Sequence, residues 1–301
     1  MPNSVEIIEV SPRDGIQNEQ KLLSLETKLE LIHRAVEAGA TRIEVTSFVN
    51  PKRVPQMAEA DEICAALPRD TGCRYIGLAL NKRGFERASN AGLDEVNFVV
   101  VATDTFSEKN QGTDTDTGIR MFKDLMQAAP ASVSAGVTIA AAFGCPFEGE
   151  VSVDRLMHAV RGCMESNPFE LALADTIGVA TPVDIAERIG AVRAEYPDVP
   201  LRLHLHNTRN TGLANAWAGV QAGVAALDSS FGGVGGCPFA PAATGNIPTE
   251  DLVYMLERAG IDTGVNLHKA INAAEFLQDS LGKTVPGMVM KAGVFPQGAT
   301  A

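Results

Sequence analysis

The chain lacks the segments that mark membrane proteins and disulfide scaffolds. No apolar run reaches the roughly 18 residues that a membrane-spanning helix needs. The amino-terminal MPNSVEIIEV shows no secretory or transit signal, and the carboxyl-terminal QGATA matches no peroxisomal or reticulum-retention tail. The five cysteines form no C-x-x-C pair and are odd in number, which is typical of reduced thiols. We therefore expect a cytoplasmic protein.

Positive charge is also scarce. The sequence has 25 lysines and arginines against 37 acidic residues, a net charge of −12. This balance argues against general binding to nucleic acid or to a membrane surface, both of which attract basic proteins. A phosphate-bearing ligand is still allowed, because it needs only a local basic patch.

What the chain does contain is a regular alternation of strand-like and helix-like segments. Several strand-like runs are nearly continuous apolar stretches, as in parallel strands buried on both faces. The eight predicted strands span residues 5–10, 41–48, 74–80, 95–102, 133–143, 170–175, 201–206 and 225–232.

The helical segments between these runs have recognisable ends. Ser24 is a predicted N-cap for the helix that stops at Gly39, and Thr181 caps a helix that begins with Pro182. The pattern predicts one (β/α)₈ TIM barrel (an α/β fold) over about 5–260, within a single catalytic domain 1–301. A helix and tail follow over about 261–301. The alternative is an open, doubly wound two-domain sheet; regular spacing and the missing G-x-G-x-x-G disfavour it.

Residues 201–207, LRLHLHN, place two of the five histidines one leucine apart. On a helix such residues point in different directions, whereas on a strand they share a face. We therefore expect His204 and His206 to point into the barrel together. The alternative is that both are hydrogen-bonded core histidines with a purely structural role.

Other polar residues fall at the carboxyl ends of predicted strands, where barrels build their active sites. The ends of strands 7, 8 and 1 are neighbours in a closed barrel, so residues far apart in sequence converge. Two imidazoles, a carboxylate and an amide oxygen suit a divalent cation. We predict that Asp14, His204, His206 and Asn246 are its ligands. The remaining polar residues at these ends are Arg13, Gln17, Glu44, Asp175, Thr176 and Cys237.

Two of these positions leave alternatives open. Arg202 shares the inward parity of His204 and, if buried, needs a carboxylate, for which Glu44 is the candidate. Glu44 is then either a structural partner or a catalytic group. Cys237 follows the glycine-rich segment 232–236, which lacks the G-K-[ST] of a phosphate-binding loop. Its thiol is either inert or a catalytic group beside the cation.

These motifs resemble the 3-hydroxy-3-methylglutaryl-CoA (HMG-CoA) lyase family, within the metal-dependent barrel superfamily that includes isopropylmalate synthase. The similarity runs nearly end to end. It includes SPRDGIQNE, EVTSFVNPKRVPQM, FGCPFEGEV, LADTIGVATP, GGCPFAPAATGN and TGNIPTEDLVYMLERAGIDTGVNL. The resemblance implies Mg²⁺ or Mn²⁺ at the predicted ligands, catalytic or supporting roles for Arg13, Glu44, Asp175 and Cys237, and a homodimer.

It also implies cleavage of an acyl-CoA thioester to acetyl-CoA and acetoacetate, as in leucine breakdown. In this scheme the cation lowers the pKa of the substrate hydroxyl, and His204 or Asp175 takes its proton. Arg13 faces the thioester oxygen as enolate charge develops, and Cys237 protonates the enolate carbon as a general acid.

Substrate contacts are assigned by the same resemblance. The match at KN makes Lys109 and Asn110 the candidates for CoA, ahead of the loop pairs 52–53 and 82–83, and we expect Gln17 and Thr176 to face the substrate. Arg209 departs from the family, where a tyrosine is usual, and could meet a carboxylate or a CoA phosphate. Gly136 aligns with a family arginine.

These departures leave the acyl group open. The alternatives are a lyase for citramalyl-CoA or for a longer branched 3-hydroxyglutaryl-CoA, and, more remotely, a metal-binding barrel without catalysis. The intact set of Arg13, Asp14, His204, His206 and Cys237 speaks against the last.

Overall fold

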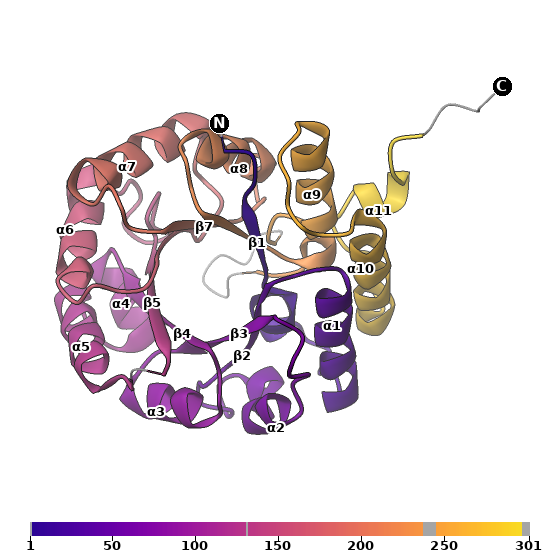
Figure 1. Ribbon diagram of the computed structural model, residues 1–301. Helices are drawn as coiled ribbons and strands as arrows, with labels where there is room; N and C mark the ends of the chain where they lie inside the picture. The colour runs from indigo at the N-terminus through magenta and orange to yellow at the C-terminus, as the bar shows by residue number, and fades with distance from the viewer. Residues whose placement is uncertain (1, 131, 237–244, 297–301) are drawn as a thin grey trace.

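A computed structural model describes residues 2–130, 132–236 and 245–296 of the chain. Its strands form a closed parallel barrel in which consecutive strands pair and β1 also pairs with β8. The ring of strands lies inside a ring of helices (Figure 1). The predicted barrel is therefore confirmed. The strands are β1 (Glu6–Glu9), β2 (Arg42–Ser47), β3 (Arg74–Ala79), β4 (Glu95–Val101), β5 (Ser134–Ala140), β6 (Leu171–Asp175), β7 (Leu201–Leu205) and β8 (Ala226–Ser229).

The helices follow the strands, as the barrel pattern requires, with two helices after β4. The α-helices are α1 (Leu25–Glu37), α2 (Ala60–Ala65), α3 (Lys82–Asn90), α4 (Asp104–Gln111), α5 (Thr115–Ala128), α6 (Val153–Met164), α7 (Pro182–Glu195), α8 (Gly212–Gln221), α9 (Thr249–Arg258), α10 (Leu267–Leu281) and α11 (Val289–Ala292). Short turns of other helix types are η1 (Ser11–Gly15), η2 (Pro55–Met57) and η3 (Phe231–Gly233).

The predicted helix starts are confirmed at the level of hydrogen bonds. The Ser24 hydroxyl accepts from the Thr27 amide at the start of α1. At α7, Thr181 and Asp184 form a reciprocal capping box, with Pro182 in the first turn. Local sequence thus decides where these helices begin, since each cap satisfies amides that have no partner inside the helix.

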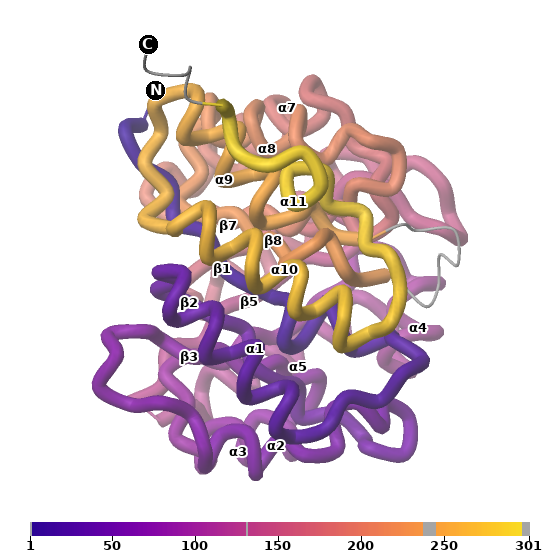
Figure 2. The backbone as a smooth tube through the Cα atoms, turned by 90° about the vertical axis from the view of Figure 1, so that its right-hand side faces the viewer, coloured from indigo at the N-terminus to yellow at the C-terminus, as the bar shows by residue number. Residues whose placement is uncertain are grey.

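The carboxyl-terminal segment adds helices to one side of the barrel. α10 packs against α1 and α9, and α11 packs against α9 and α10 (Figures 1 and 2). This confirms the helix predicted within about 261–301. Among the helices of the described residues, none is long and apolar enough to cross a membrane.

The two faces of the strands have different chemistry. Side chains that face the helices form one large apolar core. The barrel interior instead holds buried charges, among them Arg42, Glu44, Glu95, Arg202 and Asp228. The charged interior is continuous with the carboxyl ends of the strands, where the predicted site residues lie.

Candidate active site

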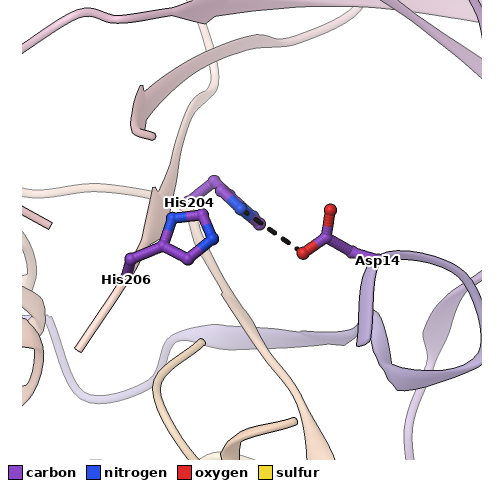
Figure 3. Close-up of side chains that lie close together, drawn as sticks. All are labelled: Asp14, His204 and His206. Atoms are coloured by element: carbon purple, nitrogen blue, oxygen red, sulfur yellow. Dashed lines mark ion pairs between the residues drawn. The ribbon is translucent and has the colours of Figure 1, made fainter. Parts of the chain in front are cut away.

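His204 and His206 converge with Asp14 at the carboxyl end of the barrel (Figure 3). His204 lies within β7, and His206 follows directly after it, with the ring centroids 5.0 Å apart. The Nε2 atom of His204 lies 3.8 Å from Oδ2 of Asp14. One ligand atom from each of the three residues lies within 4.8 Å of the others. The predicted inward parity of the two histidines is confirmed.

Asp14 reaches the histidines because the chain turns sharply after β1. Residues Ser11–Gly15 form the single turn η1, with proline near its start. A Cβ atom at Gly15 would lie 2.7 Å from Oγ of Ser230 and 3.2 Å from the carbonyl oxygen of Val234. Only glycine therefore lets η1 pack this closely against the end of β8.

Asn246 completes the cluster from the segment after the glycine-rich loop. It forms an isolated β-bridge with His206, which holds it at the end of β7. Its Nδ2 donates to Oδ2 of Asp14 (2.8 Å) and to the carbonyl of Val234 (3.1 Å). Asn246 thus orients Asp14 in this arrangement, and its carbonyl oxygen would have to turn toward an ion to bind it.

The two imidazoles have different outer partners. Nδ1 of His204 hydrogen-bonds Oδ2 of Asp228 at 3.0 Å, whereas Nδ1 of His206 faces the backbone carbonyl of Asp175 at 2.9 Å. Burial lowers the pKa of His204, but Asp228 and Asp14 raise it more, so it lies above its ordinary value. Burial and the charge of His204 lower the pKa of His206 to about 4.

Asp14 is held in its charged form. Burial alone would raise its pKa, but the charges of Arg13 and the two histidines, with the bond from Asn246, bring the pKa below its usual range. Arg13 donates from Nη1 to Oδ1 of Asp14 at 2.6 Å. A pre-ionised carboxylate beside two ring nitrogens is the donor set of a divalent-cation site.

Arg13 and Glu44 form a buried pair next to Asp14. Nε of Arg13 donates to Oε2 of Glu44 at 2.7 Å, and a second contact joins Nη2 to the same carboxylate. The prediction that Glu44 pairs with Arg202 is therefore wrong. Arg202 instead contacts Glu170 at 3.3 Å and Asp228 at 3.6 Å. The turn η1 brings the guanidinium of Arg13 to Glu44, whereas strand register brings Glu170 and Asp228 to Arg202.

A cavity of about 170 Å³ lies above the charged interior. Its walls are partly apolar, with Leu78, Val99 and Phe106, and its deep end is polar, with Asn97, Thr138 and Arg202. It also contains predicted site residues from four segments of the chain. These are Arg13, Asp14, Gln17, Asn110, Thr176, His204 and His206.

Other predicted residues lie beside the cavity or away from it. The Asp175 carboxylate accepts from the amides of Val179 (2.9 Å) and Ala180 (3.0 Å), so it caps the loop after β6. Burial raises the pKa of Asp175. Nζ of Lys109 lies 5.1 Å from the ring centroid of Phe147, near the cavity residue Phe106. Cys237 lies outside the described residues.

The Arg209 side chain hydrogen-bonds backbone carbonyl groups. Its Nη1 donates to the carbonyls of Ile177 (3.0 Å) and Gly178 (2.9 Å), which ties the loop after β6 to the loop after β7. The side chain is partly exposed, so its role toward a substrate stays a prediction.

Sequence reasoning missed Asp228 as a site residue. Asp228 is only 5% exposed, lines the cavity and contacts His204. A signal was available, because an aspartate within the buried strand ALDS is unusual unless it is paired. Asn97 and Thr138 were missed as well, although each is a polar residue flanked by apolar residues within a strand.

The cluster fits a divalent cation. Metal–ligand bonds of about 2.1 Å place opposite ligands about 4 Å apart, which is compatible with the spacing of these atoms. Mixed oxygen and imidazole ligands are used for several divalent metal ions. Asp14, His204, His206 and Asn246 are the residues that could hold it.

Comparison with known proteins assigns the chain to a family. The HMGL-like family model matches residues 4–277. A curated (R)-citramalyl-CoA lyase of Chloroflexus aurantiacus is 42% identical, with 98% of this chain and 96% of that protein aligned. The mitochondrial hydroxymethylglutaryl-CoA lyase of Rattus norvegicus is 41% identical, over 97% of this chain and 90% of the relative.

Solved structures give the same assignment. The crystal structure of Bacillus subtilis HMG-CoA lyase superposes with a TM-score of 0.93 at 36% identity, covering 97% of this chain and 99% of the other. An HMG-CoA lyase from Acinetobacter baumannii, in complex with coenzyme A and 3-methylmalate, also gives 0.93 at 35% identity, covering 98% of each chain. The chain therefore belongs to the HMGL-like family and is an oxo-acid lyase.

Proposed function

We propose that this protein cleaves HMG-CoA to acetyl-CoA and acetoacetate with the help of Mg²⁺ or Mn²⁺. The observation that carries the proposal is the position of Arg13 beside the Asp14–His204–His206 cluster in one cavity. This arrangement offers a cation site and an adjacent fixed positive charge, which are the two things that a retro-aldol cleavage of a thioester needs.

Asp14, His204, His206 and Asn246 would hold the ion. When bound, the ion lowers the pKa of the substrate hydroxyl and favours its alkoxide. Asp14 is already charged and His206 is already neutral near pH 7, because their pKa values lie well below that pH. Neither ligand would have to release a proton when the ion binds.

Arg13 is proposed to face the thioester oxygen. As the C2–C3 bond breaks, its electron pair moves to C2 and is shared with that oxygen as an enolate. A fixed guanidinium stabilises this charge, and removing such a donor typically costs about 10²–10³ in kcat. Glu44 positions the guanidinium from behind, since it accepts from Nε while Nη1 bonds Asp14.

The hydroxyl proton needs a base in the cavity. Of the two bases predicted, His204 lines the cavity, whereas the Asp175 carboxylate is bound to the amides of its own loop. With the ion bound, Nε2 of His204 would be a ligand and its Nδ1 bonds Asp228, so His204 would have no free nitrogen for this step. We therefore propose Asp175 as the base, since burial raises the pKa of its carboxyl and its backbone carbonyl bonds the neighbouring His206.

Cys237 is proposed to donate its thiol proton to C2 of the enolate, which completes acetyl-CoA. The support comes from the sequence, since the residue follows the glycine-rich segment next to the site. Gly236, the last described residue of that segment, accepts from Asn18 at 2.8 Å and lines the cavity. Cys237→Ser should lower turnover by orders of magnitude without weakening metal binding; unchanged turnover would refute this role.

CoA is proposed to lie across the cavity mouth near α4. Asn110 lines the cavity, and Lys109 on the same helix supplies a positive charge for a phosphate. Gln17 and Thr176 also line the cavity and are proposed substrate contacts. Arg209 is the candidate for a charged group beyond them.

The decisive experiment is acetyl-CoA release from HMG-CoA with Mg²⁺ or Mn²⁺ and a thiol reductant, with and without chelator. Rapid, chelator-sensitive release is expected. His206→Ala should abolish it, and His33→Ala, at an exposed position of α1, is the matched control. Equal activity of the two variants would contradict the assigned ligand set.

A second substrate has specific support. The 42% identical relative is an (R)-citramalyl-CoA lyase, and citramalyl-CoA undergoes the same bond cleavage with a different acyl group. The same assay with citramalyl-CoA separates the two. If release occurs from citramalyl-CoA and not from HMG-CoA, the mechanism stands and the substrate changes.

A further inference from the structure

Asp228 is a buried carboxylate to which the proposed chemistry gives no task. It lies on β8 directly across from His204 on β7, as strand register pairs the two residues. Its Oδ2 atom is 3.0 Å from Nδ1 of His204. The carboxylate therefore contacts the one ring nitrogen of His204 that faces away from Asp14.

This contact decides which nitrogen of His204 carries the hydrogen. A neutral imidazole has one N–H donor and one lone pair, and an ionised carboxylate can only accept. With Asp228 at Nδ1, the hydrogen belongs on Nδ1. The lone pair is then on Nε2, which points toward Oδ2 of Asp14 at 3.8 Å.

Asp228 is itself held in place from below. Nε of Arg202 lies 3.6 Å from its Oδ1, and Nη1 of Arg202 lies 3.3 Å from Glu170. Nη2 of Arg202 also donates to Thr138 at 3.3 Å. Glu170 and Thr138 thus hold the guanidinium, which faces Asp228 as an ion pair without a hydrogen bond.

The ring of His206 is oriented by a backbone group instead of a side chain. Its Nδ1 meets a backbone carbonyl, that of Asp175, at 2.9 Å. A carbonyl is neutral and stays when side chains are changed. The orientation of His204, by contrast, depends on a side chain, so it can be tested by substitution without touching any of the proposed ligands.

We propose that Asp228, which forms an ion pair with Arg202, is the positioning residue that holds His204 as the Nδ1–H tautomer and presents Nε2 to the Asp14 cluster. The part that concerns metal affinity rests on the proposed function. Outer partners of this kind typically change metal affinity about 10–100-fold when they are removed.

The first test needs neither metal nor a variant of Asp228. Nitrogen-15 NMR of the wild-type protein in chelator, at a pH high enough for the His204 ring to be neutral, reports which of its ring nitrogens is protonated, with His204→Gln to assign the signal. We expect the Nδ1–H form. The Nε2–H form would overturn the proposal whatever the metal data show.

The second test compares Mn²⁺ affinities of the wild type, Asp228→Asn, Asp228→Ala and Glu170→Gln by calorimetry. Glu170→Gln is the matched control, because Glu170 is also a buried carboxylate on Arg202. Alanine should weaken Mn²⁺ binding about 10–100-fold. Asparagine should weaken it less and populate both tautomers, since an amide can accept or donate.

The controls separate this proposal from the proposed function. Unchanged affinity in both Asp228 variants, or an equal loss in Glu170→Gln, would overturn the positioning role. A wild-type protein that binds no Mn²⁺ but shows the Nδ1–H form would instead contradict the metal site and leave the tautomer assignment standing.

Discussion

The two faces of the barrel strands are equally buried but chemically opposite. On β7 the residues Leu201, Leu203 and Leu205 join the apolar core beneath the helices. Arg202 and His204, which alternate with them, face the charged interior, and all five are buried. The comparison teaches that burial alone does not identify a functional face, whereas the polarity of one parity along a buried strand does.

The two layers also rely on different physics. The outer layer is stabilised by close packing, so truncating one of its side chains leaves a cavity and lowers the free energy of unfolding. The interior is stabilised only as long as each charge keeps its partner, because an isolated buried charge is very unfavourable. The variants below test this difference and then the solvent-facing helices, from the largest expected effect to the smallest.

Arg42→Ala breaks the interior layer. Arg42 donates to Glu170 at 2.7 Å and to Glu95 at 2.5 Å, so its loss leaves these two buried carboxylates with only their longer contacts to Arg202 (3.3 Å) and Arg74 (3.2 Å). We expect a loss of about 3–5 kcal/mol in the free energy of unfolding, measured by urea denaturation. Arg74→Ala is the control, because Arg74 is 44% exposed at the end of the same network, and should cost about 0–1 kcal/mol. Equal losses would mean that burial does not matter here.

Leu203→Ala damages the outer layer on the same strand. Leu203 is fully buried and packs toward Gly219 of α8, so truncation leaves a cavity. We expect a loss of about 2–5 kcal/mol with Mn²⁺ affinity unchanged. His206→Ala should do the reverse, abolishing Mn²⁺ binding at little cost in stability. A comparable fall in Mn²⁺ affinity for both variants would show that the layers are coupled.

Glu9 is a polar exception in the outer layer, and it predicts a pH dependence. Burial, opposed by hydrogen bonds from Thr249 and Ser11, raises its pKa from 4.5 to about 7. The folded state therefore keeps a proton that the unfolded chain releases. Stability is full below about pH 4.5 and falls as pH rises through 7, by about 3 kcal/mol at about 1.4 kcal/mol per pKa unit.

Urea denaturation across this pH range checks the effect. Glu9→Gln should remove about half of the slope between pH 4.5 and 7, because Glu250 contributes a similar slope over this range. Glu250, whose pKa burial raises to about 8, should keep a residual slope at higher pH. A wild-type protein that gains stability over this range would contradict the assignment.

Thr181→Ala tests the solvent-facing helices, outside both layers. It removes the cap of α7, whose hydroxyl accepts from the Asp184 amide. We expect a loss of about 1 kcal/mol and no change in lyase activity. Val183→Ala, in the same turn and 78% exposed, is the control that should leave the unfolding midpoint unchanged.

Much of the fold could be predicted because its signals are local. The apolar runs, the Ser24 and Thr181 caps and the inward parity of the two histidines are properties of short segments, and the structure confirms them. The convergence of Asp14 with strand 7 followed from barrel closure. The roles of Cys237 and of the CoA contacts stay predictions.

The charge partners could not be predicted in the same way. Sequence parity places Glu44 and Arg202 inside the barrel, but it does not say which cation reaches which carboxylate. The turn η1 places Arg13 against Glu44, and the register of β7 and β8 places Asp228 against both His204 and Arg202.

By itself, the sequence determined the alternation of strands and helices, the helix ends and the inward side of the strand that carries Arg202 and His204, because these depend on neighbouring residues and on the two-residue repeat of a strand. The tertiary structure alone decided the pairing of the buried charges and the nitrogen that His204 turns toward Asp14. Those depend on register, barrel closure and distances between atoms far apart in the chain, which no local pattern encodes.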